Sequence, residues 1–234
     1  LLYDPDVMDV HHRPGDSPNA PSFDQTVGID RDVDALSDPV VWSKPPFECW
    51  VTPKRGNPFM LIGVHAKSKA AHGAKTDADA MRINIANRRK QLAQCIWLRR
   101  RVDTLLDAQT PTIVLGDFND GPGLDDYEKL FGRSGVEIVL GDADEHALFD
   151  PNAHMALTNR FAKPTTARFW ISSQKRFLSA LLDYVMVSNA LRPQADWHIW
   201  HPFDDAVIYE NMALRDALLT ASDHFPVSVD LPSG

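Results

Sequence analysis

"IVLGDFND", residues 113–120, is an apolar run that ends in an acid, an aromatic, an amide and a second acid. The apolar half predicts a buried strand. The residues that follow, NDGPG at 119–123, are a strong turn signal. A plain turn would account for Asp117 and Asn119 by itself. A functional interpretation requires partners from other parts of the chain that reach the same place.

Three other predicted strands carry polar residues of the same kind at one end. His65 follows MLIGV, Asp183 lies inside LLDYVMV, and SDH at 222–224 precedes FPVSV. Two of the four clusters stand at the carboxyl ends of their strands and two near the amino ends. If the first pair of strands runs antiparallel to the second, all four clusters share one edge of a sheet. The predicted pocket then contains His65, Asp117, Asn119, Asp183, Asp223 and His224.

The remaining pattern predicts an α/β protein. Segments rich in apolar and β-branched residues predict strands at 47–52, 59–65, 112–117, 181–188, 196–201 and 225–231. Helical spacing predicts one long helix over 77–106 and shorter helices at about 125–131 and 211–219. Residues 13–58 are expected to be mostly loop with a strand or two, and 66–76 a mobile loop.

The long predicted helix carries a group of basic residues. We expect them on a face exposed to solvent, with contact to nucleic acid as the alternative. The group comprises the arginines at 88, 89, 99, 100 and 101.

Composition indicates an ordinary globular protein. The 234 residues, 44% hydrophobic and 24% charged, are expected to form a single domain over 1–234. No apolar stretch has the roughly 20 residues of a membrane helix. The net charge of −8 argues against bulk electrostatic binding of nucleic acid. It leaves a local phosphate site open, since carboxylates that hold a divalent cation still attract phosphate. Cys49 and Cys95 lie in apolar surroundings and predict buried free thiols.

The predicted pocket contains the groups that phosphoester hydrolysis needs. Hard divalent cations such as Mg²⁺ prefer oxygen ligands, and Asp223 is a suitable one. Hydrolysis also needs an activated water and help for the leaving oxygen, which a carboxylate and a histidine supply. Asp183 near His224 would fix the tautomer of that imidazole and stabilise its charged form.

Three motifs, IVLGDFND, LLDYVMVS and SDHFPVSV in that order, resemble the endonuclease/exonuclease/phosphatase superfamily. Its members include DNase I, abasic-site endonucleases, neutral sphingomyelinases and inositol polyphosphate 5-phosphatases. The resemblance runs from about residue 59 to the end. GVHAKSK at 63–69 resembles the branch of the superfamily that carries a histidine at the end of the strand predicted here at 59–65. It implies a two-sheet α/β sandwich with helices packed outside, a DNase I-like four-layer fold.

The resemblance also implies a role for each pocket residue. Asp117 would orient or deprotonate the attacking water, and Asn119 would bind the phosphate or that water. Asp223 would ligate the metal, Mg²⁺ or alternatively Mn²⁺ or Ca²⁺. His224, with Asp183 as its partner, would act as acid or base on the scissile phosphate. His65 would contact the phosphate or assist the leaving group, with Lys67 as a weaker candidate for a phosphate contact.

The implied activity is metal-dependent hydrolysis of a phosphodiester, nuclease-like, with DNA or RNA among the substrates. The alternatives are a phosphomonoesterase, a sphingomyelinase-type lipid phosphodiesterase, and a non-catalytic binding module on the same fold. We expect a soluble monomer and leave the compartment open between cytoplasm and secretion or periplasm. The Asn and the metal-binding Glu that this family carries near its N-terminus are not identifiable. Glu48 stands later in the order of motifs than that Glu would, so we do not assign it the role. We therefore expect that an N-terminal portion is missing.

Overall fold

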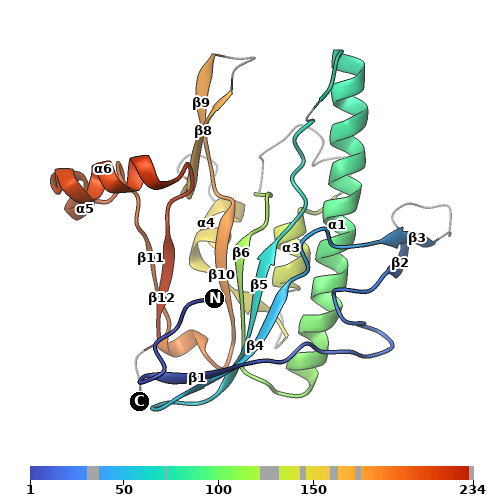
Figure 1. Ribbon diagram of the computed structural model, residues 1–234, viewed down its shortest axis with the longest axis vertical. Helices are drawn as coiled ribbons and strands as arrows, with labels where there is room; N and C mark the ends of the chain where they lie inside the picture. The colour runs from blue at the N-terminus through green and yellow to red at the C-terminus, as the bar shows by residue number, and fades with distance from the viewer. Residues whose placement is uncertain are drawn as a thin grey trace.

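The structure is a computed structural model that describes residues 1–30, 37–71, 73–121, 132–142, 146–158, 163–171 and 175–231. It shows a mixed α/β fold built on one central sheet (Figure 1). The helix expected at 125–131 lies outside the described residues. The strands are β1 (Met8–His12), β2 (Val27–Asp30), β3 (Ser37–Val40), β4 (Phe47–Pro53), β5 (Phe59–His65), β6 (Thr112–Asp117), β7 (Leu148–Phe149), β8 (Ala167–Ile171), β9 (Arg176–Ala180), β10 (Asp183–Ser188), β11 (Asp196–Ile199) and β12 (Val227–Asp230). The helices are α1 (Asp77–Asp107), α3 (Gly135–Leu140), α4 (Pro151–Thr158), α5 (Ala206–Glu210) and α6 (Met212–Ala221), with a 3₁₀ turn at Arg192–Gln194.

The central sheet has six strands in the order β1-β4-β5-β6-β10-β7. β5 and β6 are parallel and are joined by the crossover helix α1, whereas β10 runs antiparallel to β6. All six strands and the two helices predicted within the described residues are present. The prediction missed the short strands β1, β7, β8 and β9 and the helices α3, α4 and α5. It expected a strand or two within 13–58 but gave no position for β2 and β3.

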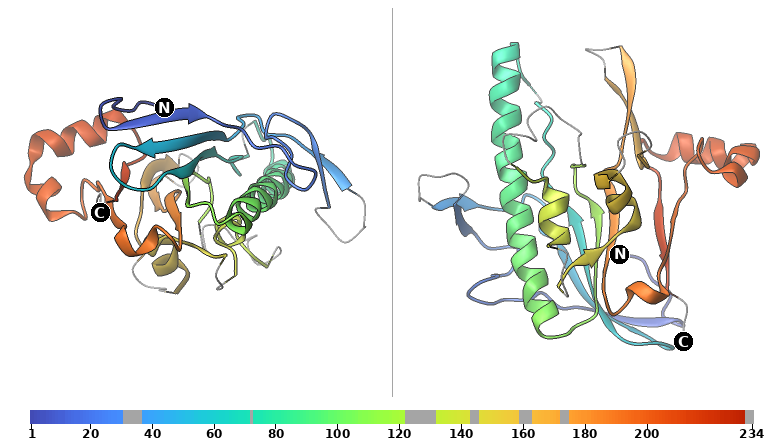
Figure 2. Two further views of the ribbon diagram at one scale, coloured as in Figure 1. Left: turned by 90° about the horizontal axis from the view of Figure 1, so that it is seen from below. Right: turned by 180° about the vertical axis from the view of Figure 1, so that it is seen from behind.

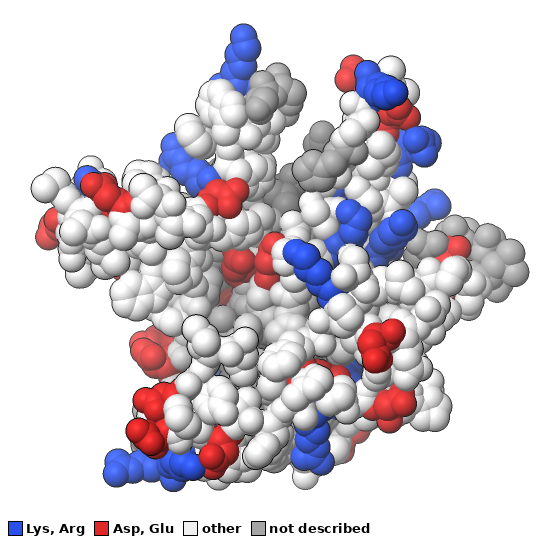
Figure 3. Space-filling model, in the orientation of Figure 1, with Lys and Arg blue, Asp and Glu red and all other residues white. Residues whose placement is uncertain are grey.

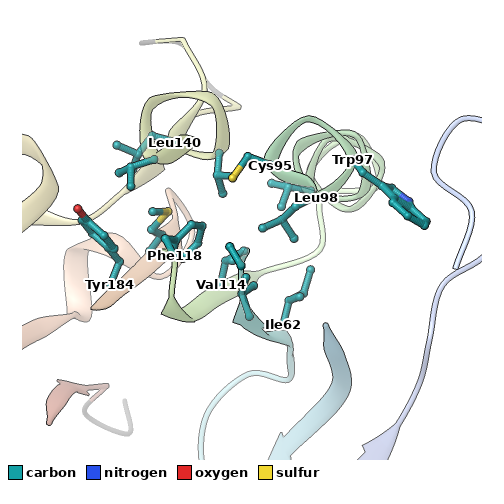
Figure 4. Close-up of a cluster of buried hydrophobic side chains, with 14 of the residues drawn as sticks. Ile62, Cys95, Trp97, Leu98, Val114, Phe118, Leu140 and Tyr184 are labelled. Carbon is teal, nitrogen blue, oxygen red and sulfur yellow. The ribbon is translucent and has the colours of Figure 1, made fainter. Parts of the chain in front are cut away.

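Side chains alternate between the two faces of this sheet, as the period of a strand requires. Ile62, Val64 and Val114 point to the face covered by α1, α3 and α4. Figure 4 shows Cys95 and Leu98 of α1 and Leu140 of α3 closing on that face, while Trp97 points the other way, where it packs on Phe23. The main core is therefore the layer between the sheet and these helices.

The opposite face of the sheet carries a second apolar cluster under the β11–β12 ribbon. Ile113, Val185 and Val187 pack there against Val227 and Val229. Among the described residues, the second β layer consists of this two-stranded ribbon, and α5 and α6 lie beyond it (Figures 1 and 2). An apolar cavity of about 1030 Å³ lies beside the ribbon, lined by residues that include Leu1, Val10, Val51, Leu115 and Leu231.

The arginines of α1 correct one expectation. Arg89 and Arg100 are exposed as predicted, but Arg88 and Arg101 are 1% and 8% exposed. Arg99 donates to the carbonyl oxygens of Val139 and Leu140 at the end of α3. The prediction was wrong for these three residues because apolar periodicity cannot distinguish a buried, paired guanidinium from a solvated one.

The N-terminal segment is attached to the helix through Arg101. Its guanidinium binds the buried Glu48 of β4 at 2.6 Å, and Glu48 also accepts from the backbone N–H of Gly15 at 2.9 Å. Glu48 is thus part of a buried ion pair with Arg101. Cys49 and Cys95 are buried free thiols, as expected.

Candidate active site

Sheet register brings three of the predicted residues into one row. Asp117 at the end of β6 pairs with His65 of β5 on one side and with Asp183 of β10 on the other. The expectation that strand direction would gather these side chains at one edge is therefore confirmed. Figures 1 and 2 show the β8–β9 hairpin and the first turns of α1 projecting beyond this edge.

Gly116 explains why the apolar strand can end in this way. Its φ of +134° is a conformation open to glycine, and a Cβ there would lie 2.0 Å from the carbonyl oxygen of Val64. The next side chain, that of Phe118, is fully buried against Tyr184. Asn119 then adopts a positive φ of +49°. The chain turns sharply and leaves Asp117 and Asn119 partly exposed on one side.

Asp117 and Asn119 form a local hydrogen-bonded unit. The backbone N–H of Asn119 donates to Oδ1 of Asp117 at 2.7 Å, and its amide Nδ2 donates to Oδ2 at 3.0 Å. Nδ2 also donates to the carbonyl of Ala66, which follows β5. Asn119 therefore holds the carboxylate of Asp117 in one orientation and ties it to the neighbouring strand.

Asp120, the second carboxylate of the opening motif, is structural. It is fully buried, binds the ammonium of Lys69 at 2.5 Å, and accepts from the backbone N–H of Gly135 at 2.6 Å. Lys69 belongs to the loop that was expected to be mobile. Further bonds, from Asn87 to the carbonyl of Ala70 and from Lys67 N–H to Gln94, also anchor that loop to α1.

Asp183 and His224 form the predicted pair. Nδ1 of His224 lies 2.8 Å from Oδ2 of Asp183. The same oxygen accepts from the hydroxyl of Thr166 at 2.8 Å, and that hydroxyl accepts from the backbone N–H groups of Leu182 and Asp183, each at 3.0 Å. Thr166 is completely buried. It therefore uses its full hydrogen-bonding capacity to orient the carboxylate of Asp183.

The β8–β9 hairpin connects His224 to the sheet. Ala167 forms an isolated bridge with His224, and the backbone N–H of Phe225 donates to the carbonyl of Thr166 at 2.6 Å. The N–H of Arg168 donates to the carbonyl of Asp223 at 2.8 Å. These backbone bonds bring SDH at 222–224 beside β10, although β12 belongs to a different sheet.

Two pKa values in the pocket are shifted. Burial raises the pKa of Asp117, assisted by the negative charge of Asp183 and opposed by the hydrogen bond from Asn119. For His224, partial burial alone would lower the pKa, but the hydrogen bond and charge of Asp183, with the charges of Asp117 and Asp223, raise it above its usual range. The carboxyl is thus a stronger base, and the imidazole holds its proton to higher pH, than in open solvent.

Carboxylates and the histidine lie close enough to hold a cation. Within the described ranges, Asp117, Asp183 and His224 form a group whose ligand atoms lie within 4.8 Å of one another. Two of the three donors are carboxylates, the type that Mg²⁺ prefers. Asp223, the residue predicted as the metal ligand, is exposed and lies outside this group, although its charge acts on His224. Figure 3 shows acidic side chains in a hollow near the middle of the molecule, with basic side chains on the adjoining surface.

The two remaining candidates lie on the β5 side. His65 is half exposed, and its Nε2 is 3.7 Å from Oδ2 of Asp117, so it belongs to the same pocket. The ammonium of Lys67 donates to the carbonyl of Ser68 within its own loop. Sequence reasoning missed Thr166 and Lys44, whose ammonium lies 3.1 Å from His65.

A sequence model of the Endonuclease/Exonuclease/phosphatase family matches residues 9–224, which is most of the chain. The chain belongs to this family. The resemblance seen in the three motifs is thereby confirmed, and the family consists of hydrolytic phosphoesterases that generally depend on divalent metals. Comparison with curated proteins gave no match. No described helix combines the length and apolar character needed to cross a bilayer.

Solved structures with a similar fold are distant in sequence. The 3′ phosphatase NExo from Neisseria, bound to product DNA hairpin, is 16% identical with a TM-score of 0.48, over 96% of this chain and 70% of that one. The mannosyl-6-phosphatase Bt3783 of Bacteroides thetaiotaomicron is 16% identical with a TM-score of 0.43, over 98% and 69%. The human Nocturnin catalytic domain is 17% identical with a TM-score of 0.39, over 96% and 73%.

Proposed function

We propose that this endonuclease/exonuclease/phosphatase family member hydrolyses a phosphodiester with an activated water and a divalent cation, in the manner of a nuclease. The observation that carries the proposal is the convergence of Asp117, Asp183 and His224 from three separate parts of the chain within 4.8 Å. Structural needs alone do not account for this convergence. Like charges that are brought together out of solvent are unfavourable unless a cation, a proton or a ligand compensates them.

Asp117 is the candidate base. Its carboxylate is held by two hydrogen bonds from Asn119, which fixes the oxygen that faces the attacking water. Its pKa is raised toward neutral pH, which makes the carboxylate a stronger base for accepting a proton from water. In the proposed step the water oxygen forms a bond to phosphorus while Asp117 accepts a proton from that water.

His224 is the candidate acid. Its Nδ1 is engaged by Asp183, which leaves Nε2 as the nitrogen that can donate to the substrate. Because its pKa is raised, the imidazole carries this proton over a wider pH range than a free histidine. As the bond between phosphorus and the leaving oxygen breaks, His224 transfers its proton to that oxygen, and Asp183 stabilises the charged ring before the transfer.

Asp117 and Asp183 offer carboxylate oxygens for a divalent cation, Mg²⁺ being the first candidate and Mn²⁺ or Ca²⁺ the alternatives. When bound, the cation would neutralise the negative charge that develops on the phosphate oxygens. His65, on the β5 side of Asp117, would contact the phosphate. Asn119 would act through Asp117, because both hydrogens of its amide are already donated to Asp117 and to the carbonyl of Ala66.

The direct test is Mg²⁺- or Mn²⁺-dependent hydrolysis of bis-p-nitrophenyl phosphate compared with p-nitrophenyl phosphate. We expect cleavage of the diester that EDTA abolishes. Preference for the monoester would favour a phosphomonoesterase, and cleavage of neither ester would favour a binding module without turnover.

A panel of plasmid DNA, abasic duplex, sphingomyelin and inositol phosphates then separates the substrate classes. We expect activity on a nucleic acid. Cleavage of sphingomyelin alone would reject the nuclease-like proposal in favour of a lipid phosphodiesterase.

A further inference from the structure

The β8–β9 hairpin carries two large aromatic side chains that remain exposed. Trp170 and Phe177 stand directly opposite each other on the two strands, with their ring centroids 5.1 Å apart. Their exposed fractions are 52% and 53%. A cross-strand aromatic pair stabilises a hairpin. Rings that stay more than half exposed beside basic side chains are also typical of binding surfaces.

The pair continues into a row of rings with a guanidinium among them. Arg168 lies on the same face of β8 as Trp170, because the two residues are two positions apart on the strand. The guanidinium carbon of Arg168 lies 4.8 Å from the ring centroid of Phe177 and 4.9 Å from that of Phe203, which is 40% exposed. These four side chains, from Phe203 through Arg168 and Phe177 to Trp170, form the aromatic row.

The other face of the hairpin packs inward and fixes the direction of the aromatic row. Phe169, between Arg168 and Trp170 on β8, points to that inner face and packs on a small buried cluster. The cluster consists of Ala167, Ala180 and Leu182. Because the inner face is held in this way, the aromatic row has its orientation before any substrate binds.

The aromatic row begins beside the pocket. The backbone N–H of Arg168 donates to the carbonyl of Asp223 at 2.8 Å, and Ala167 forms a bridge with His224. Trp170 stands three residues beyond Ala167, which is about 10 Å of extended strand. About three stacked nucleotides of one strand cover that length. A polynucleotide whose scissile phosphate lies at His224 can therefore place an adjacent base on the row.

The hairpin has both kinds of group that bind a single-stranded nucleic acid. Aromatic rings stack on bases of any sequence, and positive side chains attract the phosphates. Lys175 and Arg176, where β9 begins, are exposed, and Figure 3 shows basic side chains on this projecting part of the surface. A lipid surface fits less well, because the charged Arg168 in the middle of the row would be costly among acyl chains.

We propose that the aromatic row stacks unpaired bases of a single-stranded nucleic acid that runs from the pocket along the β8–β9 hairpin. This inference rests on the proposed phosphodiester hydrolysis and specifies its substrate class. A closed duplex turns the faces of its bases toward one another, so it offers the rings less to stack on. The aromatic row therefore selects single strands, or duplex ends with unpaired nucleotides.

Binding of a fluorescein-labelled oligothymidylate of about 15 nucleotides, measured by fluorescence anisotropy in EDTA, tests the proposal without turnover. We expect the wild type to bind this oligonucleotide more tightly than a duplex of the same length. Trp170→Leu and Phe177→Leu keep an apolar side chain but lose the ring face, so each should raise the Kd by about tenfold. Trp170→Phe and Phe177→Tyr should keep most of the affinity. Because both rings are exposed, each leucine variant should unfold at a urea concentration close to that of the wild type.

A matched control is available on α5. Tyr209 is 51% exposed, and the guanidinium carbon of Arg215 lies 5.2 Å from its ring centroid, so this pair resembles the pair of Arg168 and Phe177. It does not belong to the aromatic row. Tyr209→Leu removes an exposed ring of the same kind and should leave the Kd for the oligonucleotide at the wild-type value.

Vesicles of phosphatidylcholine and phosphatidylglycerol test the competing partner, a lipid surface. We expect the protein to stay in the supernatant when these vesicles are sedimented. A wild type that binds the vesicles and not the oligonucleotide would overturn the proposal. Equal affinity for the duplex and the single strand would overturn it as well, because stacking requires unpaired bases.

Kinetics separate the aromatic row from the proposed function. For hydrolysis of the oligonucleotide in Mg²⁺, Trp170→Leu and Phe177→Leu should raise KM more than they lower kcat, because the row holds the substrate away from the reacting atoms. A wild type that binds the oligonucleotide through the row but hydrolyses no phosphodiester would reject the proposed function and leave the binding surface standing. A wild type that hydrolyses bis-p-nitrophenyl phosphate, with leucine variants that bind the oligonucleotide as tightly as it does, would reject the row alone.

Discussion

Replacement of Thr166 by valine tests how the pocket is held. The hydroxyl makes three hydrogen bonds, one donated to Asp183 and two accepted from the backbone N–H groups of Leu182 and Asp183. Valine keeps the shape and leaves the buried N–H of Leu182 and the partly buried N–H of Asp183 without this acceptor. At about 1 to 3 kcal/mol for each buried unsatisfied group, partly offset by relaxation, we expect a loss of about 2 to 4 kcal/mol. A domain with a stability of about 5 to 15 kcal/mol still folds after such a loss.

The measurement is the free energy of unfolding in urea for Thr166→Val, with Thr166→Ser as the variant that keeps the hydroxyl. Thr158→Val is the surface control, because its hydroxyl donates to a carbonyl within α4 at an exposed site. The control should lie within about 0.5 kcal/mol of the wild type. A Thr166→Val protein as stable as this control would refute the reasoning that the hydroxyl satisfies buried backbone groups.

Three further predictions concern the base and acid, the strand end and the buried ion pair. The pH profile of kcat/KM should be bell-shaped, because Asp117 must be deprotonated and His224 protonated. Since the pKa values of both groups are raised, both limbs of the profile should lie at higher pH than for an ordinary aspartate and histidine. Asp183→Asn removes the charge that raises the pKa of His224, so it should move the alkaline limb to lower pH. Gly116→Ala should lower the unfolding free energy by about 2 to 4 kcal/mol in urea titrations, because its Cβ meets Val64 at positive φ, and a wild-type value would contradict the strained geometry. Glu48→Leu should lower the unfolding free energy by about 3 to 5 kcal/mol, because it leaves Arg101 buried without this partner. The double variant Glu48→Leu/Arg101→Met should recover most of that free energy. A double variant as unstable as Glu48→Leu would argue against this account.

Much of the sheet could be predicted from the sequence because its strands are buried on both faces. Continuous apolar runs such as FMLIGVH and TIVLGD fit few structures other than a buried strand. The polar residue at the end of each run indicates the functional edge of the sheet. The edge strands were harder to predict. β1 contains MDVHH and β3 contains SDPV, which are short and half exposed, so their sequences resemble loops.

The pocket was predicted through its charged side chains, and its supporting groups were not. Asp117, Asp183 and His224 stand out because a carboxylate beside an apolar run requires a partner. Thr166 is an ordinary residue in sequence, and its role depends on which strands become neighbours. Arg88 shows the converse, since a charged residue that was expected on a solvated face is buried within the structure.

The most direct measurement of the central claim is the rate of bis-p-nitrophenyl phosphate hydrolysis in Mg²⁺ by Asp117→Asn and His224→Gln, compared with the wild type. If the two residues act as base and acid in one pocket, each variant should be slower by about a hundredfold or more while its unfolding free energy stays close to the wild type. Hydrolysis by either variant at the wild-type rate would contradict the assignment of that residue and the hydrolytic pocket built on it.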